Sequence, residues 1–215
     1  MHDIDTRWAA RVALALALAA AGPARATIEH VDVQTTGLPA TFVLAFDFID
    51  GGAPSNRVTL SDFSSDGSLG SATRSGDAAG SLPGGVALGD ASFFNEYLVP
   101  ITGAHRIAFD FDYSNNTPPA NAVPDAFSFF LLDVQGQLPL FHTSDPSGAD
   151  ALFALQLDGS AQGWLTVDVA SSGPAATWSV APVVATVPEP ATGWLLLAGL
   201  GALGACRRRG AGERP

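Results

Sequence analysis

The middle of the chain alternates apolar and polar residues with a period of two, and this alternation restricts it to β-structure. In Thr41–Ile49, and again in His105–Tyr113, every second residue is Phe, Leu, Ile or Tyr. A period of two is typical of a strand with one face in a core. Ala126–Asp133 is apolar at both parities, which indicates a central strand. No helical period with caps is found in this region.

About nine such segments are separated by Gly, Pro, Ser, Asn and Asp. They predict an all-β fold, an antiparallel β-sandwich or jelly roll, whose core is rich in the thirteen Phe residues. The stretch Ser64–Gly85 is nearly all Ser, Gly, Asp and Ala, so we expect a mobile loop there. The expected strands are Ile28–Thr35, Thr41–Ile49, Arg57–Phe63, Phe93–Ile101, His105–Tyr113, Ala126–Asp133, Leu152–Leu157, Trp164–Val169 and Ala176–Val183.

Residues 1–26 have the features of a signal peptide. Arg7 and Arg11 flank the start of the apolar run Val12–Ala21, which is too short to span a bilayer as a permanent helix. Ala24 and Ala26 form a small-x-small pattern, so we expect cleavage after Ala26 and export through the Sec translocon. An uncleaved signal anchor is the alternative.

The other end of the chain combines three features in a fixed order. A Pro-rich linker, residues 181–190, precedes the uncharged apolar run Ala191–Cys206. As a helix this run rises about 24 Å, close to the thickness of a bilayer core, so it predicts one transmembrane helix. The basic segment 207–215 follows, and the positive-inside rule keeps it in the cytoplasm. The defining residues are Val187, Pro188, Glu189, Pro190, Arg207, Arg208 and Arg209.

This order of Val-Pro-Glu-Pro, apolar helix and Arg cluster resembles the PEP-CTERM sorting signal of Gram-negative bacteria. The resemblance implies an exosortase-type membrane protease as a partner, which removes the tail. It also implies transient insertion in the inner membrane and then delivery to the cell surface or extracellular matrix. An ordinary tail anchor is the alternative interpretation.

Between the two ends, residues 27–180 are expected to form one acidic domain. From Thr27 to Val187 the chain has fifteen Asp and two Glu against three basic residues, Arg57, Arg74 and Arg106. Such a surface repels nucleic acid, which excludes it as a partner. The chain's one Cys lies in the apolar tail, so the domain has no disulfide, thiolate metal site or Cys nucleophile.

The motifs of common enzyme classes are missing from the sequence. It contains no nucleophile elbow, Walker loop or dinucleotide fingerprint, and its His residues lack the spacing of a zinc site. Asp110 and Asp112 could form a glycosidase carboxylate pair, but two Asp residues on a solvated strand face are the simpler explanation. We therefore expect a protein that is not an enzyme, with a glycoside hydrolase as a further alternative.

Several loops could supply oxygen ligands to calcium. Asp47 and Asp50 border the loop Asp50–Asn56, and Asp62 and Asp66 border the next one. Turn-forming Asp residues that bond their own backbone are the alternative explanation. Calcium is therefore a candidate cofactor for these loops.

Ile107–Tyr113, a polar loop and Asp125–Leu131 resemble the strand–loop–strand of legume-type lectins. The resemblance implies that Asp125 binds sugar hydroxyls, although Ala126 follows it where that family has Gly. It also implies a metal role for Asp158, at the second position of that family's Glu-x-Asp pair, where Gln156 replaces the Glu.

Two hypotheses follow for the domain itself. The first is a structural or adhesive component of an exopolysaccharide-associated biofilm. The alternative is a lectin-like carbohydrate-binding module with exopolysaccharide as its partner and calcium as a candidate cofactor. The domain also resembles uncharacterised surface domains that precede PEP-CTERM tails.

Overall fold

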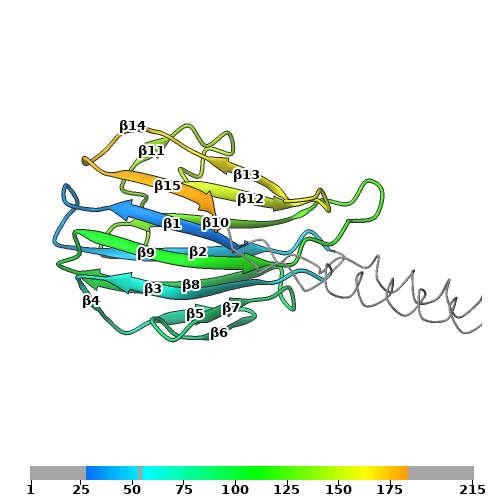
Figure 1. The fold of residues 1–215 in the computed structure, drawn as a ribbon, viewed down its shortest axis with the longest axis horizontal. Helices are drawn as coiled ribbons and strands as arrows, with labels where there is room; N and C mark the ends of the chain where they lie inside the picture. Colours follow the sequence, from blue (N-terminus) through cyan, green and yellow to red (C-terminus); the bar gives the residue numbers. More distant parts are fainter. Residues whose placement is uncertain (1–27, 53–54, 184–215) are drawn as a thin grey trace, which may run out of the picture. The chain divides into compact units, whose positions relative to one another are not determined.

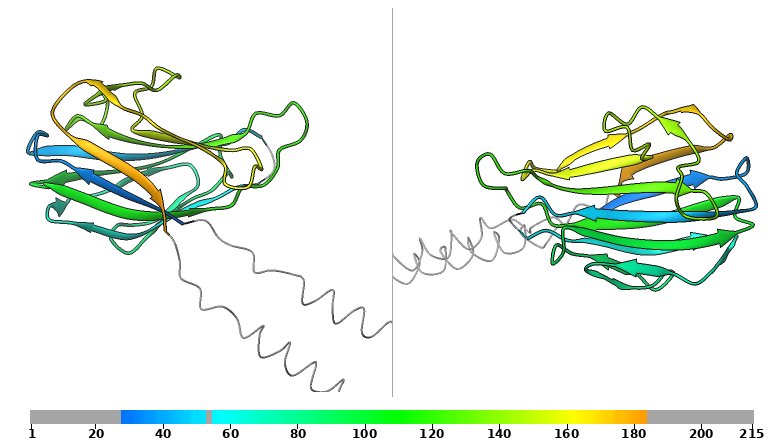
Figure 2. Two further views of the ribbon diagram at one scale, coloured as in Figure 1. Left: turned by 45° about the horizontal axis from the view of Figure 1, so that its top comes forward. Right: turned by 180° about the vertical axis from the view of Figure 1, so that it is seen from behind.

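Two antiparallel sheets face each other across an apolar core (Figure 1). The computed structural model describes residues 28–52 and 55–183, and the further views in Figure 2 show the same two layers from other sides. The predicted signal peptide, transmembrane helix and basic tail lie outside the described residues. Within the described part, no helix is long and apolar enough to cross a membrane.

The first sheet has six strands, in the order β15-β1-β9-β3-β7-β6. Every pairing in it is antiparallel, and β1 lies between β15 and β9. The strands are β15 (Thr177–Pro182), β1 (Ile28–Gln34), β9 (Arg106–Tyr113), β3 (Val58–Ser65), β7 (Val86–Leu88) and β6 (Ala78–Gly80).

The second sheet has seven strands, in the order β13-β12-β10-β2-β8-β4, with β5 also paired to β8. A separate pair, β11 (His142–Thr143) and β14 (Ala170–Ser172), completes the domain. The strands of the second sheet are β13 (Trp164–Val167), β12 (Phe153–Leu157), β10 (Asp125–Leu132), β2 (Thr41–Ile49), β8 (Phe94–Thr102), β4 (Ser68–Leu69) and β5 (Thr73–Ser75).

Phe residues from both sheets fill the core, as the sequence predicts. The Phe46 ring centroid lies 4.9 Å from that of Phe129 on the neighbouring strand and 5.2 Å from that of Phe109 on the opposite sheet. All three side chains are fully buried. This ring contact across the sandwich joins the two sheets at their centres, and aromatic pairs at such distances add stability beyond the area they bury.

The structure confirms the predicted antiparallel β-sandwich and corrects one segment. Ser64–Gly85 is not one loop, because it contains β4, β5 and β6. β4 and β5 hydrogen-bond to the longer strand β8, and β6 hydrogen-bonds to β7. All three are too short to show an apolar alternation that a sequence pattern could detect. At the other end β15 continues to Pro182, two residues into the segment predicted as linker.

The core arrangement predicts a large difference between two Phe-to-Ala substitutions. Phe46→Ala should lower the free energy of unfolding by about 3–5 kcal/mol, because it leaves a cavity between the sheets. Phe93→Ala should change it by less than about 0.5 kcal/mol, since that side chain is 74% exposed. Denaturant unfolding of both variants measures this, and equal losses would contradict the described core.

Candidate functional site

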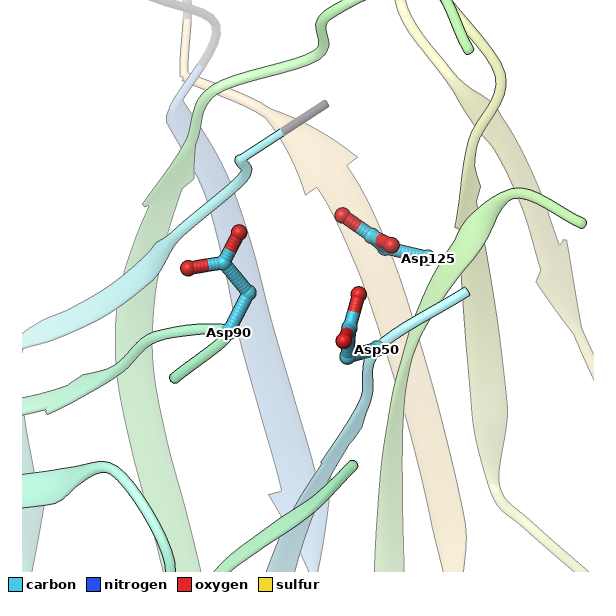
Figure 3. A group of neighbouring side chains, drawn as sticks. All are labelled: Asp50, Asp90 and Asp125. Atoms are coloured by element: carbon cyan, nitrogen blue, oxygen red, sulfur yellow. The ribbon is translucent and has the colours of Figure 1, made fainter. Parts of the chain in front are cut away.

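Three carboxylates meet at one end of the seven-stranded sheet (Figure 3). Asp50 follows β2, Asp90 lies in the turn before β8, and Asp125 begins β10. Because β2 pairs antiparallel with both β8 and β10, the end of β2 lies beside the beginnings of its two neighbours. One carboxylate oxygen from each residue lies within 4.8 Å of the others.

Asp125 is the buried member of this cluster, with 1% of its surface exposed. Its Oδ1 accepts a hydrogen bond from the Gly51 N–H (2.7 Å), and its Oδ2 accepts one from the Asn56 side-chain amide (2.8 Å). The Asn56 Oδ1 in turn accepts the Asn116 N–H at 2.8 Å. Asp125 therefore ties the loop after β2 to the loop after β9.

The backbone at Gly51 explains why glycine stands there. A Cβ on this residue would lie 2.0 Å from the Val123 carbonyl oxygen, a distance that no side chain can occupy. The close approach lets the Gly51 N–H reach the Asp125 carboxylate. The loop that carries Asp50 is thus held beside Asp125 by backbone packing as well as by hydrogen bonds.

Asp50 and Asp90 are more accessible than Asp125, and the backbone around them belongs partly to residues with exposed apolar side chains. Asp50 accepts the Gly52 N–H at 2.7 Å and donates its own N–H to the Phe93 carbonyl at 3.0 Å. Phe93 is 74% exposed, and Val123, beside Gly51, is 68% exposed. Three carboxylates this close repel one another unless a cation lies among them, and calcium prefers oxygen ligands of this kind.

The sequence had singled out two of the three members. Asp50 was expected as a calcium ligand and Asp125 as a sugar-binding residue, and the structure brings both together. Asp90 was missed, because the pairing that places its turn beside β2 is not visible in a local pattern. The sugar contact of Asp125 stays a prediction, since both of its oxygens accept hydrogen bonds from the protein.

The other predicted metal residues lie outside this cluster. Asp66 accepts the N–H groups of His105 and Arg106, and these bonds lower its pKa to about 2. Asp158 lies after β12, where its Oδ1 accepts the Ser160 N–H, and hydrogen bonds from Ser160 lower its pKa. The metal role of Asp158 stays a prediction, and the structure places this residue in a groove described below.

Asp47 belongs to a different acidic pair, on the outer face of the seven-stranded sheet. It lies directly opposite Glu96 in the β2–β8 register, and its Oδ1 is buried without a hydrogen-bond partner among the described residues. Burial, and then the neighbouring Glu96, raise the pKa of Asp47 to about 7. Burial also raises the pKa of Glu96.

Comparison with known proteins identifies the end of the chain. Residues 186–209 match the PEP-CTERM protein-sorting motif, which confirms the predicted sorting signal. Such signals are recognised by exosortase, a membrane protein, so the motif implies exosortase-dependent export to the cell surface. The matched residues lie outside the part that the structure describes. No curated protein and no solved structure matches the chain.

The Asp47 environment predicts how stability depends on pH. A carboxyl whose pKa is raised from 3.8 to about 7 on folding contributes most to stability below pH 4, and the contribution is lost as the pH rises towards 7. Asp47→Asn removes the ionisation, so the variant should be more stable than the parent above pH 7, by about 2–4 kcal/mol. Denaturant unfolding at a series of pH values measures this difference.

Asp66→Asn serves as a control of opposite sign. Its pKa is lowered on folding, so this variant should be the less stable protein at neutral pH, and the difference should vanish as the pH falls through about 2. Parallel stability curves for Asp47→Asn and the parent would contradict the described burial of Asp47.

Proposed function

We propose that the protein is a non-enzymatic component of the cell surface or extracellular matrix, with a structural or adhesive role in an exopolysaccharide-associated biofilm. The observation that carries this proposal is the sorting motif at residues 186–209, which follows a folded β-sandwich domain in the sequence. The acidic composition of the domain supports it, since net charge keeps an exported domain soluble.

The ends of the domain fit removal of both flanking segments. The Val183 N–H donates to the Ile28 carbonyl at 2.7 Å, so the chain enters and leaves the sandwich at neighbouring points. The expected cleavage after Ala26 and a cut near Pro188–Pro190 both fall outside β1 and β15. Both cuts would therefore leave the sandwich strands and their hydrogen bonds intact.

The intact mass of the protein recovered from the outer surface of its native host tests this proposal. We expect a species that begins at Thr27 and ends near the Pro-Glu-Pro element. Replacing Glu189 and Pro190 by Ala should keep the protein in the inner membrane with its tail uncut. A parent protein found only in the inner membrane, with a mass that still includes Trp194 to Arg209, would refute sorting.

The carboxylate cluster favours a second candidate function, calcium-assisted carbohydrate binding in the manner of a lectin. Asp50, Asp90 and Asp125 offer converging oxygen ligands, and the backbone of Phe93, whose side chain is exposed, accepts a hydrogen bond from Asp50. In this arrangement Asp125 holds the loops and the ion, while a sugar would meet the ion and the aromatic ring. The ion and the aromatic ring would then contact the sugar at the same end of the sheet.

Calcium should therefore raise the unfolding temperature of the protein, and Asp90→Asn should abolish the rise. At a concentration about a hundred times the dissociation constant, binding stabilises by about 2.7 kcal/mol, which corresponds to a shift of several degrees. Asp66→Asn should respond like the parent. Retention on an immobilised polysaccharide, with and without calcium, then tests the sugar. An equal calcium response of Asp90→Asn and the parent would exclude this site.

A further inference from the structure

A groove with both polar and apolar walls lies between the edge strands β15 and β13. These two strands lie on the same side of the sandwich (Figure 1). The groove has a volume of about 520 Å³, within the range of sites that bind small molecules. It is separate from the three-carboxylate cluster, with which it shares no residue. The residues of the groove that matter here are Glu29, Asp158, Ser160, Gln162 and Trp164.

Glu29 is the unusual member of this groove. It lies on the core-facing side of β1 with Val31 and Val33, and it is only 6% exposed. Its Oε2 has no hydrogen-bond partner among the described residues, and burial raises its pKa. A buried carboxyl without a donor costs free energy, so this side chain would be stabilised by a ligand that supplies one.

The turn that forms the opposite wall is held in place by the end of β9. The Gly159 N–H donates to the Asn115 Oδ1 at 2.8 Å, and the Asn115 amide donates to the Ser160 carbonyl at 2.5 Å. The Tyr113 hydroxyl donates to the Gln162 carbonyl. These bonds fix the backbone around Asp158, so ligand binding would not carry the entropic cost of ordering this turn.

Trp164 supplies an aromatic surface at the groove, and 65% of the residue is exposed. Among the described residues no Lys, Arg or His lines the groove, and the titratable side chains found there, Glu29 and Asp158, are both acids. Carboxylates and an indole ring together favour a cationic group, because both attract positive charge. The hydroxyl of Ser160 and the amide of Gln162 add groups that can bond to sugar hydroxyls.

We propose that this groove binds a saccharide unit that carries a free amino group. The ammonium donates to Glu29, the sugar ring packs against Trp164, and its hydroxyls bond to Asp158 and Gln162. An anionic saccharide is disfavoured by the two carboxylates. The inference depends on the proposed surface function only for the origin of such a glycan, since the groove is a property of the domain alone.

Calorimetric titration of the full chain tests the proposal, in a detergent without a sugar headgroup and under mildly acidic conditions. The probes are a glucosamine oligomer and its fully N-acetylated counterpart of the same length. The amino form should bind at least about tenfold more tightly, as expected for one charge-assisted hydrogen bond. Glu29→Gln should remove this preference, and Trp164→Ala should weaken both oligomers while Trp164→Phe retains part of the affinity.

Controls separate binding from folding. Glu29→Gln should unfold at the same or a higher temperature than the parent, because it removes a buried charge. Glu96→Gln, the same change on β8, should bind like the parent. Absence of binding by either oligomer, equal affinity for both, or parent-like binding by Glu29→Gln would overturn the proposal. A simple triamine that binds as tightly as the oligomer would also overturn the assignment to a saccharide.

These outcomes are independent of the sorting test. If the oligomer binds the purified chain but the tail is never cut in the host, the proposed surface function is wrong and the assignment of the groove to an amino sugar is supported. If the tail is cut and no oligomer binds, the surface function stands and the groove assignment fails.

Discussion

The contact of Phe rings across the sandwich is the constraint on which the other features depend. Phe46 packs against Phe129 beside it and Phe109 opposite it, so β2, β10 and β9 are fixed in register. A shift of one residue in β2 would turn its Phe side chains to the outer face. The same register brings the end of β2 beside the starts of β8 and β10, where Asp50 and Asp125 meet.

The long strands could be predicted because their apolar residues alternate, and the short strands could not. β5 and β6 consist of Thr, Arg, Ser, Ala and Gly, so only their hydrogen bonds to β8 and β7 identify them. Asp50 could be found from its place beside a strand end and Asp125 from the resemblance to lectins, whereas Asp90 required knowledge of which strands pair. Glu29 did have a signal, since it shares the buried parity of Val31 and Val33.

The shortage of basic residues determines how this domain accommodates its carboxylates. Arg106 pairs with Asp32, but the domain has too few basic residues to pair with most of its acids. Asp133 instead accepts backbone N–H groups, which lower its pKa. Backbone N–H groups also lower the pKa of Asp66, which in addition pairs with the His105 ring. Glu29 differs from these acids, because burial raises its pKa and no donor among the described residues reaches its Oε2.

Asp47 and Glu29 both leave a buried oxygen without a donor, yet their surroundings differ in a way that matters for function. Asp47 lies opposite another carboxyl, Glu96, on the neighbouring strand. Protonation alone removes the free-energy cost of burying its charge. Glu29 lines a groove where the loops after β9 and β12 meet. Binding residues commonly lie on such loops at the end of a rigid scaffold. A proton can satisfy the first carboxyl, whereas the second also has space for a ligand that donates to it.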